Sequence, residues 1–242
     1  MTSAVERGTV PRPRGPEGHA QVVGVHGAPG RTGWKGFYGR RQLRSATEAV
    51  EWATLPPGGV SGEHRHTRTE EIYVVLTGRG ELVLDGVRHE VRPGTLALTP
   101  PGTVHGLKNA GGTTLDWWVV EAHSPRTTGV LAGRRPEEVP TVTARVFDLT
   151  ETPTVDARAV FSGPITTVRR EEAVAGGVLH LDARGREVAG FLQSGLAELL
   201  VGGDVLSLRA PVCFLVPEGS SARVEFARPS ELYLVDLEVA AR

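Results

Sequence analysis

Three histidines and one glutamate between residues 64 and 105 have the types and spacing of a metal site. His64 and His66, in GEHRHTRTEE, are two residues apart, so on a β-strand both imidazoles would project from one face, about 7 Å apart. Two neutral nitrogens at that spacing can bind one cation with bonds of about 2.0–2.2 Å. Glu70 and Glu71 follow, and because they point to opposite faces of the next strand, only one can be a ligand. A third histidine, His105, comes after the turn TPPGTVH.

The segments that must position these residues are short, β-prone and separated by turns. EEIYVVL, ELVL, HEV and TLAL each run into a turn that contains glycine, and in three of the four cases proline or a second glycine accompanies it. The pair Asp85-Gly86 between two of them is a hairpin signal, since glycine tolerates the positive φ of such turns. Helical periodicity is weak throughout. The pattern predicts an all-β barrel or sandwich.

The chain also repeats itself. Residues 78–102 lie without a gap on residues 195–219 when shifted by 117 positions, with eight of the 25 pairs identical, and residues 114–121 fall on 231–238. We interpret this as two copies of one β unit. The offset puts residues that cannot bind a metal at the four candidate ligand positions of the second copy: Leu181, Ala183, Val188 and Ala222. Glu187 corresponds to Glu70 rather than Glu71, so the second copy is predicted to be metal-free.

The spacing of the whole residue set resembles the two motifs of the cupin superfamily. The first run is Gly58, five residues, His64, one, His66, four, Glu71, six, Gly78; the second is Gly94, five residues, Pro100, one, Gly102, two, His105, three, Asn109. The resemblance covers roughly residues 35–123, and the repeat extends it to a bicupin of two tandem double-stranded β-helix barrels, which are jelly-roll-like. It implies that the metal lies inside the first barrel, on His64, His66, Glu71 and His105. The six-residue gap to Gly78 selects Glu71 over Glu70.

These observations predict four parts of the chain. Residues 1–20 form an N-terminal arm, which is either a disordered tail or a segment packed along the barrel or across a dimer. Residues 21–123 form the metal-binding barrel, residues 124–141 a linker, and residues 142–242 a degenerate barrel without metal ligands. The second barrel is expected to complete a sheet edge, bury one face of the first barrel or support a homodimer.

Composition narrows the function classes. The net charge is −1, and the 27 basic residues among 242 are scattered, which argues against a nucleic-acid partner. No apolar run approaches the ~20 residues that span a bilayer, and the start of the chain has no apolar core typical of a secretory signal. Cys213 is the single cysteine, so no intrachain disulfide can form. We expect a cytoplasmic protein with a small-molecule substrate and no membrane partner.

Several other residues are candidates for the surroundings of the metal. Tyr73 shares the face of Glu71 and is the best candidate for acid/base catalysis or substrate anchoring, with core packing as the alternative. Of Trp117 and Trp118, one must face inward, where it could line an aromatic substrate pocket or fill space. The five histidines outside the motif are expected on the surface or in hydrogen bonds: His19, His26, His89, His123 and His180.

Three imidazoles and a carboxylate leave open positions on one divalent ion per chain. Such mixed ligands favour Fe(II) or Mn(II), with Zn, Ni or Cu as further options. The first hypothesis is a dioxygenase or other oxygenase of an enolisable or aromatic substrate. The alternatives are a non-redox isomerase, cyclase or lyase that uses Mn or Zn as a Lewis acid, and a non-enzymatic cupin that binds a small molecule.

Overall fold

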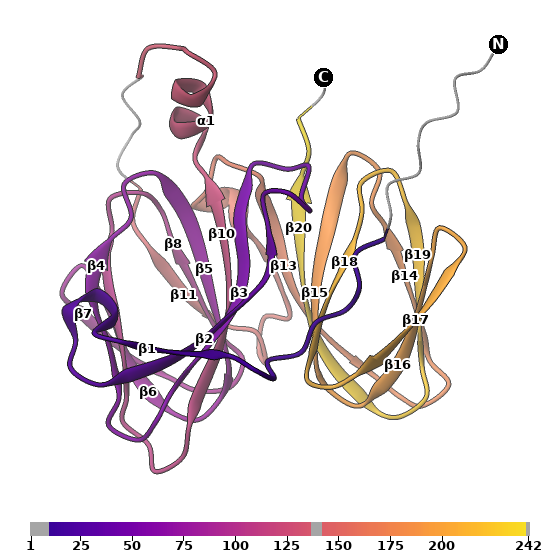
Figure 1. Cartoon of the computed structure of the whole chain (residues 1–242), viewed down its shortest axis with the longest axis horizontal. Coiled ribbons are helices and arrows are strands. Elements are labelled where there is room, and N and C mark those ends of the chain that lie inside the picture. The colour runs from indigo at the N-terminus through magenta and orange to yellow at the C-terminus, as the bar shows by residue number, and fades with distance from the viewer. Residues whose placement is uncertain (1–9, 137–141, 241–242) are drawn as a thin grey trace.

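Two β-barrels lie side by side in the computed structural model, which describes residues 10–136 and 142–240 (Figure 1). The described chain contains twenty strands, the helix α1 (Pro125–Leu131) and two 3-10 turns, η1 (Val25–Gly27) and η2 (Ala157–Ala159). Strands hold 58% of the described residues and helices 6%. The all-β prediction is therefore confirmed. None of the described helices has the length and apolar composition needed to cross a membrane.

The first barrel consists of two antiparallel sheets. The larger sheet contains, in spatial order, β1 (Ala20–Val23), β2 (Arg31–Gly39), β3 (Thr47–Leu55), β10 (Leu115–His123), β5 (Thr69–Thr77), β8 (Thr95–Thr99) and β11 (Arg145–Asp148). The smaller sheet contains β4 (Val60–Arg65), β9 (Val104–Asn109), β6 (Gly80–Leu84) and β7 (Val87–Val91).

The second barrel repeats this arrangement. One sheet contains β12 (Thr154–Asp156), β13 (Ile165–Ala173), β20 (Ser230–Glu238), β15 (Arg186–Ser194) and β18 (Val212–Val216). The other contains β14 (Val178–Asp182), β19 (Ser221–Phe226), β16 (Leu196–Val201) and β17 (Asp204–Arg209). Strands β5, β8 and β9 shifted by 117 residues have the bounds of β15, β18 and β19. The repeat seen in the sequence is therefore a repeat of barrels.

The apolar core of the described chain has three parts, of which one joins the two barrels. One core fills the first barrel and another fills the second. The third combines side chains of both halves, such as Ile72 and Trp118 with Phe191 and Tyr233. Strand β5 contributes to two of these cores, since Tyr73 and Val75 face the barrel interior while Ile72 and its alternate neighbours face the other barrel. Burial on both faces explains why IYVVL is continuously apolar.

Each barrel also contacts a segment that comes from the other half of the chain. Strand β11 pairs with β8, so the first strand after the predicted linker lies on the first barrel. The described part of the N-terminal arm runs from the second barrel to the first (Figure 1). Arg14 forms a β-bridge with Cys213, and Val10 lies in the core of the second barrel. A cut of the chain near residue 141 therefore does not separate the two barrels.

The predicted linker contains the helix α1, which its composition did not indicate. Ser124 precedes the helix, and its Oγ accepts a hydrogen bond from the backbone N–H of Thr127 at 3.3 Å. Pro125 occupies the first helical position, where a missing N–H costs nothing. The Ser-Pro pair is thus the helix signal in this segment. Residues 137–141 of the linker and residues 1–9 of the arm lie outside the described chain.

Candidate metal centre

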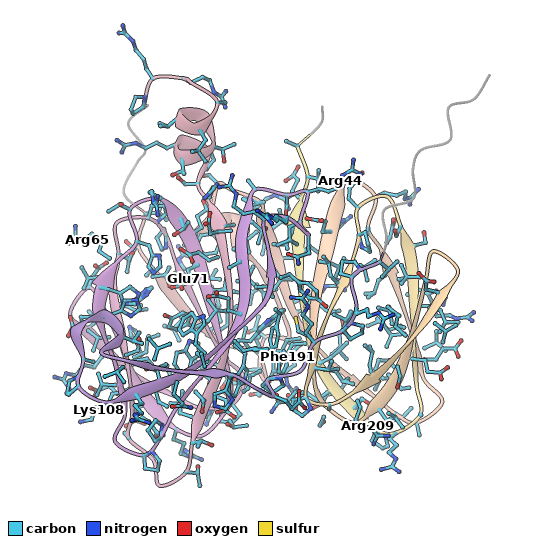
Figure 2. All side chains as sticks on the ribbon, in the orientation of Figure 1. Arg44, Arg65, Glu71, Lys108, Phe191 and Arg209 are labelled. Carbon is cyan, nitrogen blue, oxygen red and sulfur yellow. The ribbon has the colours of Figure 1, made fainter. Side chains whose placement is uncertain are left out.

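The four predicted ligands converge at one end of the first barrel. His64 lies near the end of β4 and His66 just after it, while Glu71 comes from β5 and His105 from β9. One donor atom from each residue lies within 4.8 Å of all the others. Strand pairing explains part of this convergence, because His64 and His105 are cross-strand partners. Figure 2 shows Glu71 among the strands of the first barrel and Arg65 at its outer edge.

The spacing of the donor atoms suits a single cation. His64 Nε2 lies 3.0 Å from His66 Nε2 and 2.9 Å from His105 Nε2, and His105 Nε2 lies 3.1 Å from Glu71 Oε2. With bonds of about 2.1 Å, two ligands at right angles are separated by about 3.0 Å. Three of the distances therefore match neighbouring positions around one ion. The fourth, from His66 Nε2 to Glu71 Oε2, is 3.7 Å.

Burial makes the cluster unfavourable without a cation. Glu71 is 3% exposed, and its Oε2 has no hydrogen-bond partner among the described residues. Burial raises the pKa of Glu71 to about 8. Burial, together with the neighbouring histidines, lowers the pKa of His105 to about 2. A divalent ion would compensate the carboxylate charge and occupy the imidazole lone pairs, so the residues present fit a metal.

The ring nitrogens that face away from the cluster fix two of the imidazoles. His64 Nδ1 lies 2.9 Å from the carbonyl oxygen of Gly62, and His66 Nδ1 lies 2.9 Å from Glu121 Oε1. With N–H groups at both Nδ1 atoms, the Nε2 atoms carry the lone pairs that a metal needs. Burial opposes ionisation of Glu121, but hydrogen bonds from His66 and Thr69 hold the pKa of its carboxyl below the ordinary value. Glu121 was not among the residues predicted from the sequence.

Replacing Glu121 should weaken metal binding without abolishing it. In the Glu121→Ala variant His66 loses the acceptor that orients its ring, and we expect the dissociation constant for Co(II) to rise about 10- to 100-fold. Isothermal titration calorimetry of the metal-stripped chain measures this change. Glu90→Ala, an exposed position on β7, is the control. Equal affinities for the two variants would show that Glu121 does not orient His66.

His26 was expected on the surface or in a hydrogen bond, and it lies beside the predicted ligands, which the sequence did not indicate. Its ring stacks on that of His64, with centroids 3.3 Å apart and an interplanar angle of 13°. Its Nδ1 lies 3.2 Å from Ser61 Oγ. The backbone of His26 has a left-handed φ of 52°, and a Cβ atom at Gly62 would overlap its carbonyl oxygen. Glycine at position 62 thus lets η1 lie against β4 and brings a fourth imidazole to the cluster.

Tyr73 lines the interior of the first barrel beside the cluster. Its ring centroid is 5.2 Å from that of His105 and 5.8 Å from that of Trp117. Burial raises the pKa of the Tyr73 phenol well above its usual range. Trp117 is the tryptophan that faces inward, while Trp118 packs between the barrels. Two buried aromatic rings therefore lie next to the predicted ligands.

The corresponding positions of the second barrel hold a compact apolar cluster. Leu181 and Ala222 are cross-strand partners, as are His64 and His105 in the first barrel. All four residues at these positions are buried in the core of the second barrel, namely Leu181, Ala183, Val188 and Ala222. None has a donor atom for a metal.

The remaining histidines lie apart from the cluster. The imidazole of His123, at the end of β10, contacts the carboxylate of Glu48. His19 Nε2 is hydrogen-bonded to Gln21, and His180 is exposed on β14 of the second barrel.

Sequence comparisons relate the part of the chain that carries this site to known proteins. The profile of a family described as the cupin domain matches residues 51–121. An uncharacterised protein of Methanocaldococcus jannaschii is 35% identical over 72 residues, 30% of this chain and 58% of that protein. Dimethylsulfoniopropionate lyase DddW of Ruegeria pomeroyi is 33% identical over 114 residues, which cover 43% of this chain and 70% of the lyase.

Structural comparisons extend the likeness to both barrels. The Ylba protein of E. coli superposes with a TM-score of 0.71 at 12% identity, covering 95% of this chain and 92% of that one. Salicylate 1,2-dioxygenase of Pseudoaminobacter salicylatoxidans, as its adduct with gentisate, has a TM-score of 0.62 at 14% identity, covering 84% of this chain and 72% of the enzyme. At such identities these structures show a shared fold.

Proposed function

The chain belongs to the cupin superfamily as a bicupin, and on that premise we propose that it is a metal-dependent enzyme acting on a small organic molecule. The observation that carries the proposal is the convergence of three imidazole nitrogens and the Glu71 carboxylate within 4.8 Å. Hydrogen bonds to Gly62 and Glu121 support it, because they leave Nε2 of His64 and His66 free to bind a metal.

One divalent ion per chain would be held by His64, His66, Glu71 and His105. The mixed nitrogen and oxygen donors suit Fe(II) or Mn(II), and they also accept Zn, Ni or Cu. When bound, such an ion supplies Lewis acidity, and a redox metal adds electron-transfer chemistry.

The side chains around the ligands favour a small, partly aromatic or enolisable substrate. Tyr73 and Trp117 offer ring faces for a planar molecule, and the Tyr73 hydroxyl can donate or accept a hydrogen bond. The rest of the interior is filled by aliphatic side chains such as Leu82 and Leu107. An apolar surrounding of this kind would exclude water from the reacting atoms.

The first candidate reaction is oxygenation, as by a dioxygenase. A set of three histidines and one glutamate would leave Fe(II) able to bind a chelating substrate and dioxygen, and the neighbouring rings of Tyr73 and Trp117 would suit an enolate or catecholate. Salicylate 1,2-dioxygenase shares the fold with this chain.

The second candidate is a lyase or isomerase reaction without oxygen. Its support is the relative named as a dimethylsulfoniopropionate lyase. The match is 33% identical and covers 70% of the lyase. Tyr73 lies two residues after Glu71 on the same face of β5, so its phenol could exchange a proton with a substrate held by the metal.

Oxygen consumption separates the two candidates. The Fe(II)-loaded chain is tested in an oxygen electrode against a panel of enolates and catechols, with His64→Ala as the control. Oxygenation predicts substrate-dependent oxygen uptake that the control lacks. Turnover under nitrogen with Mn(II) or Zn(II) would instead support the lyase or isomerase. Failure of the chain to bind any divalent metal would refute the proposal as a whole.

Tyr73→Phe should separate chemistry from core packing. Phenylalanine keeps the ring beside His105 and Trp117 but removes the hydroxyl, so the fold and the metal content should not change. If the hydroxyl anchors the substrate, its loss should lower kcat/KM about ten- to hundredfold. Steady-state kinetics on the substrate found in the panel measures this change. An unchanged kcat/KM would assign Tyr73 to packing alone.

A further inference from the structure

We propose that the second barrel positions the metal ligand Glu71 by holding its neighbour Glu70, which makes Glu70 a positioning residue of the centre. The inference rests on the proposed metal site and gives the second barrel a role beyond covering a face of the first. It starts from the two adjacent glutamates of β5, whose side chains point to opposite faces of one strand. Glu71 points into the first barrel and Glu70 towards the second.

The Glu70 carboxylate is bound by backbone N–H groups of the second half of the chain. Its Oε1 accepts hydrogen bonds from the amides of Ser162 and Gly163, each at 2.8 Å, and Oε2 accepts from the Gly163 amide at 3.0 Å. The Ser162 hydroxyl lies 3.4 Å from Oε1. Glu70 is 1% exposed. A buried carboxylate with two amide donors is held more firmly than a neutral side chain would be.

Gly163 is required for this contact. A Cβ atom at position 163 would overlap Glu70 Oε2 and would also lie 2.9 Å from the carbonyl oxygen of His123 on β10. The segment Ser162-Gly163 therefore packs against both β5, which carries Glu71, and β10, which carries Glu121. Any substituent at Gly163 must push the carboxylate of Glu70 away.

The same contact occurs in the opposite direction. Glu187, at the repeat position of Glu70, accepts hydrogen bonds from the amides of Arg44 and Ser45, each at 2.9 Å, and from the Ser45 hydroxyl at 2.7 Å. Ser45 shifted by 117 residues is Ser162. Each barrel thus holds a glutamate of the other in a pseudo-symmetric pair of contacts.

The two contacts differ in what they hold. Residue 71 beside Glu70 is a ligand, whereas residue 188 beside Glu187 is the core valine of the metal-free barrel. Because Glu70 and Glu71 share a peptide unit, fixing one side chain across the boundary limits rotation of β5 about its axis and fixes the direction of the other. The Glu187 contact therefore stabilises the same boundary without touching the centre, and it serves as an internal control.

The experiment compares Glu70→Gln with Glu187→Gln in the full chain, with Co(II) as the probe. In both variants the glutamine NH2 group cannot accept the hydrogen bonds that a carboxylate oxygen accepts from the backbone N–H groups. Both substitutions should therefore lower the thermal unfolding temperature. Only Glu70→Gln should raise the Co(II) dissociation constant, about 10- to 100-fold as for other residues that orient ligands, and change the visible absorption bands of bound Co(II). Gly163→Ala should reproduce the Glu70→Gln result with Glu70 intact, and it replaces that variant if Glu70→Gln does not fold.

The outcomes are distinct. Equal Co(II) affinities and spectra for the two glutamine variants would overturn the positioning role and leave two structural contacts, while the wild-type chain still binds one ion and the proposed function stands. A wild-type chain that binds no Co(II) would overturn the proposed function and this inference together.

Discussion

Alanine at position 105 is expected to remove the metal from the protein. His105 is 1% exposed, and its Nε2 lies 2.9 Å from His64 Nε2 and 3.1 Å from Glu71 Oε2, so it joins the histidine pair to the carboxylate. His105→Ala leaves three ligands around a void and keeps the Glu71 carboxylate buried. We expect the metal content after purification without added metal to fall from about one ion per chain to almost none.

Inductively coupled plasma mass spectrometry measures this change, and thermal unfolding supplies a second readout. An ion present at a hundred times its dissociation constant stabilises the folded chain by about 2.7 kcal/mol. A chelator should therefore lower the unfolding temperature of the wild-type chain and leave that of His105→Ala unchanged. His180→Ala, an exposed change on the second barrel, should behave as the wild type. Full metal content in His105→Ala would contradict the ligand assignment, and two ions per wild-type chain would contradict a metal-free second barrel.

The convergence of the four predicted ligands was predictable because local rules determine most of it. Side-chain alternation on β5 sends Glu70 and Glu71 to opposite faces, as the sequence predicted, and the HxH spacing puts two imidazoles together. The pairing of β9 with β4 then brings His105 opposite His64. The repeat offset likewise predicted that apolar residues replace the ligands in the second barrel.

The residues that the sequence did not reveal depend on contacts across long separations. Glu70 meets its partners 92 and 93 residues later, and alternation gives only its direction. Glu121 reaches His66 across 55 residues. The sequence indicates only that Glu121, four residues after Trp117 on β10, lies on the same face of that strand.

Some positions could not be assigned from periodicity because the backbone is irregular there. Trp117 and Trp118 remained undecided, and the β10–β5 register shifts between Asp116 and Trp117. His26 follows Gly24 in a segment with left-handed residues. The periodicity of side chains along strands or helices does not predict where such a segment contacts the barrel.

Phe191→Ala should destabilise both barrels, although the residue belongs to β15 of the second. Phe191 is fully buried, and its ring lies 6.1 Å from that of Phe37 and 5.9 Å from that of Trp118, both in the first half of the chain. Figure 2 places it at the junction of the barrels. Removing a buried phenylalanine ring costs about 3–5 kcal/mol. We expect that loss in the free energy of unfolding from urea titration.

Tryptophan fluorescence can test whether the barrels unfold together, because all four tryptophans lie in the first half of the chain. Phe214→Ala is the matched variant, since Phe214 is equally buried but lies in the core of the second barrel. If the shared core and the exchanged segments make one cooperative unit, both variants shift the fluorescence transition to lower urea, and circular dichroism follows the same curve. A fluorescence transition that Phe214→Ala leaves unmoved would mean that the barrels unfold separately. The second barrel could then support the metal centre only through local contacts such as those of Glu70.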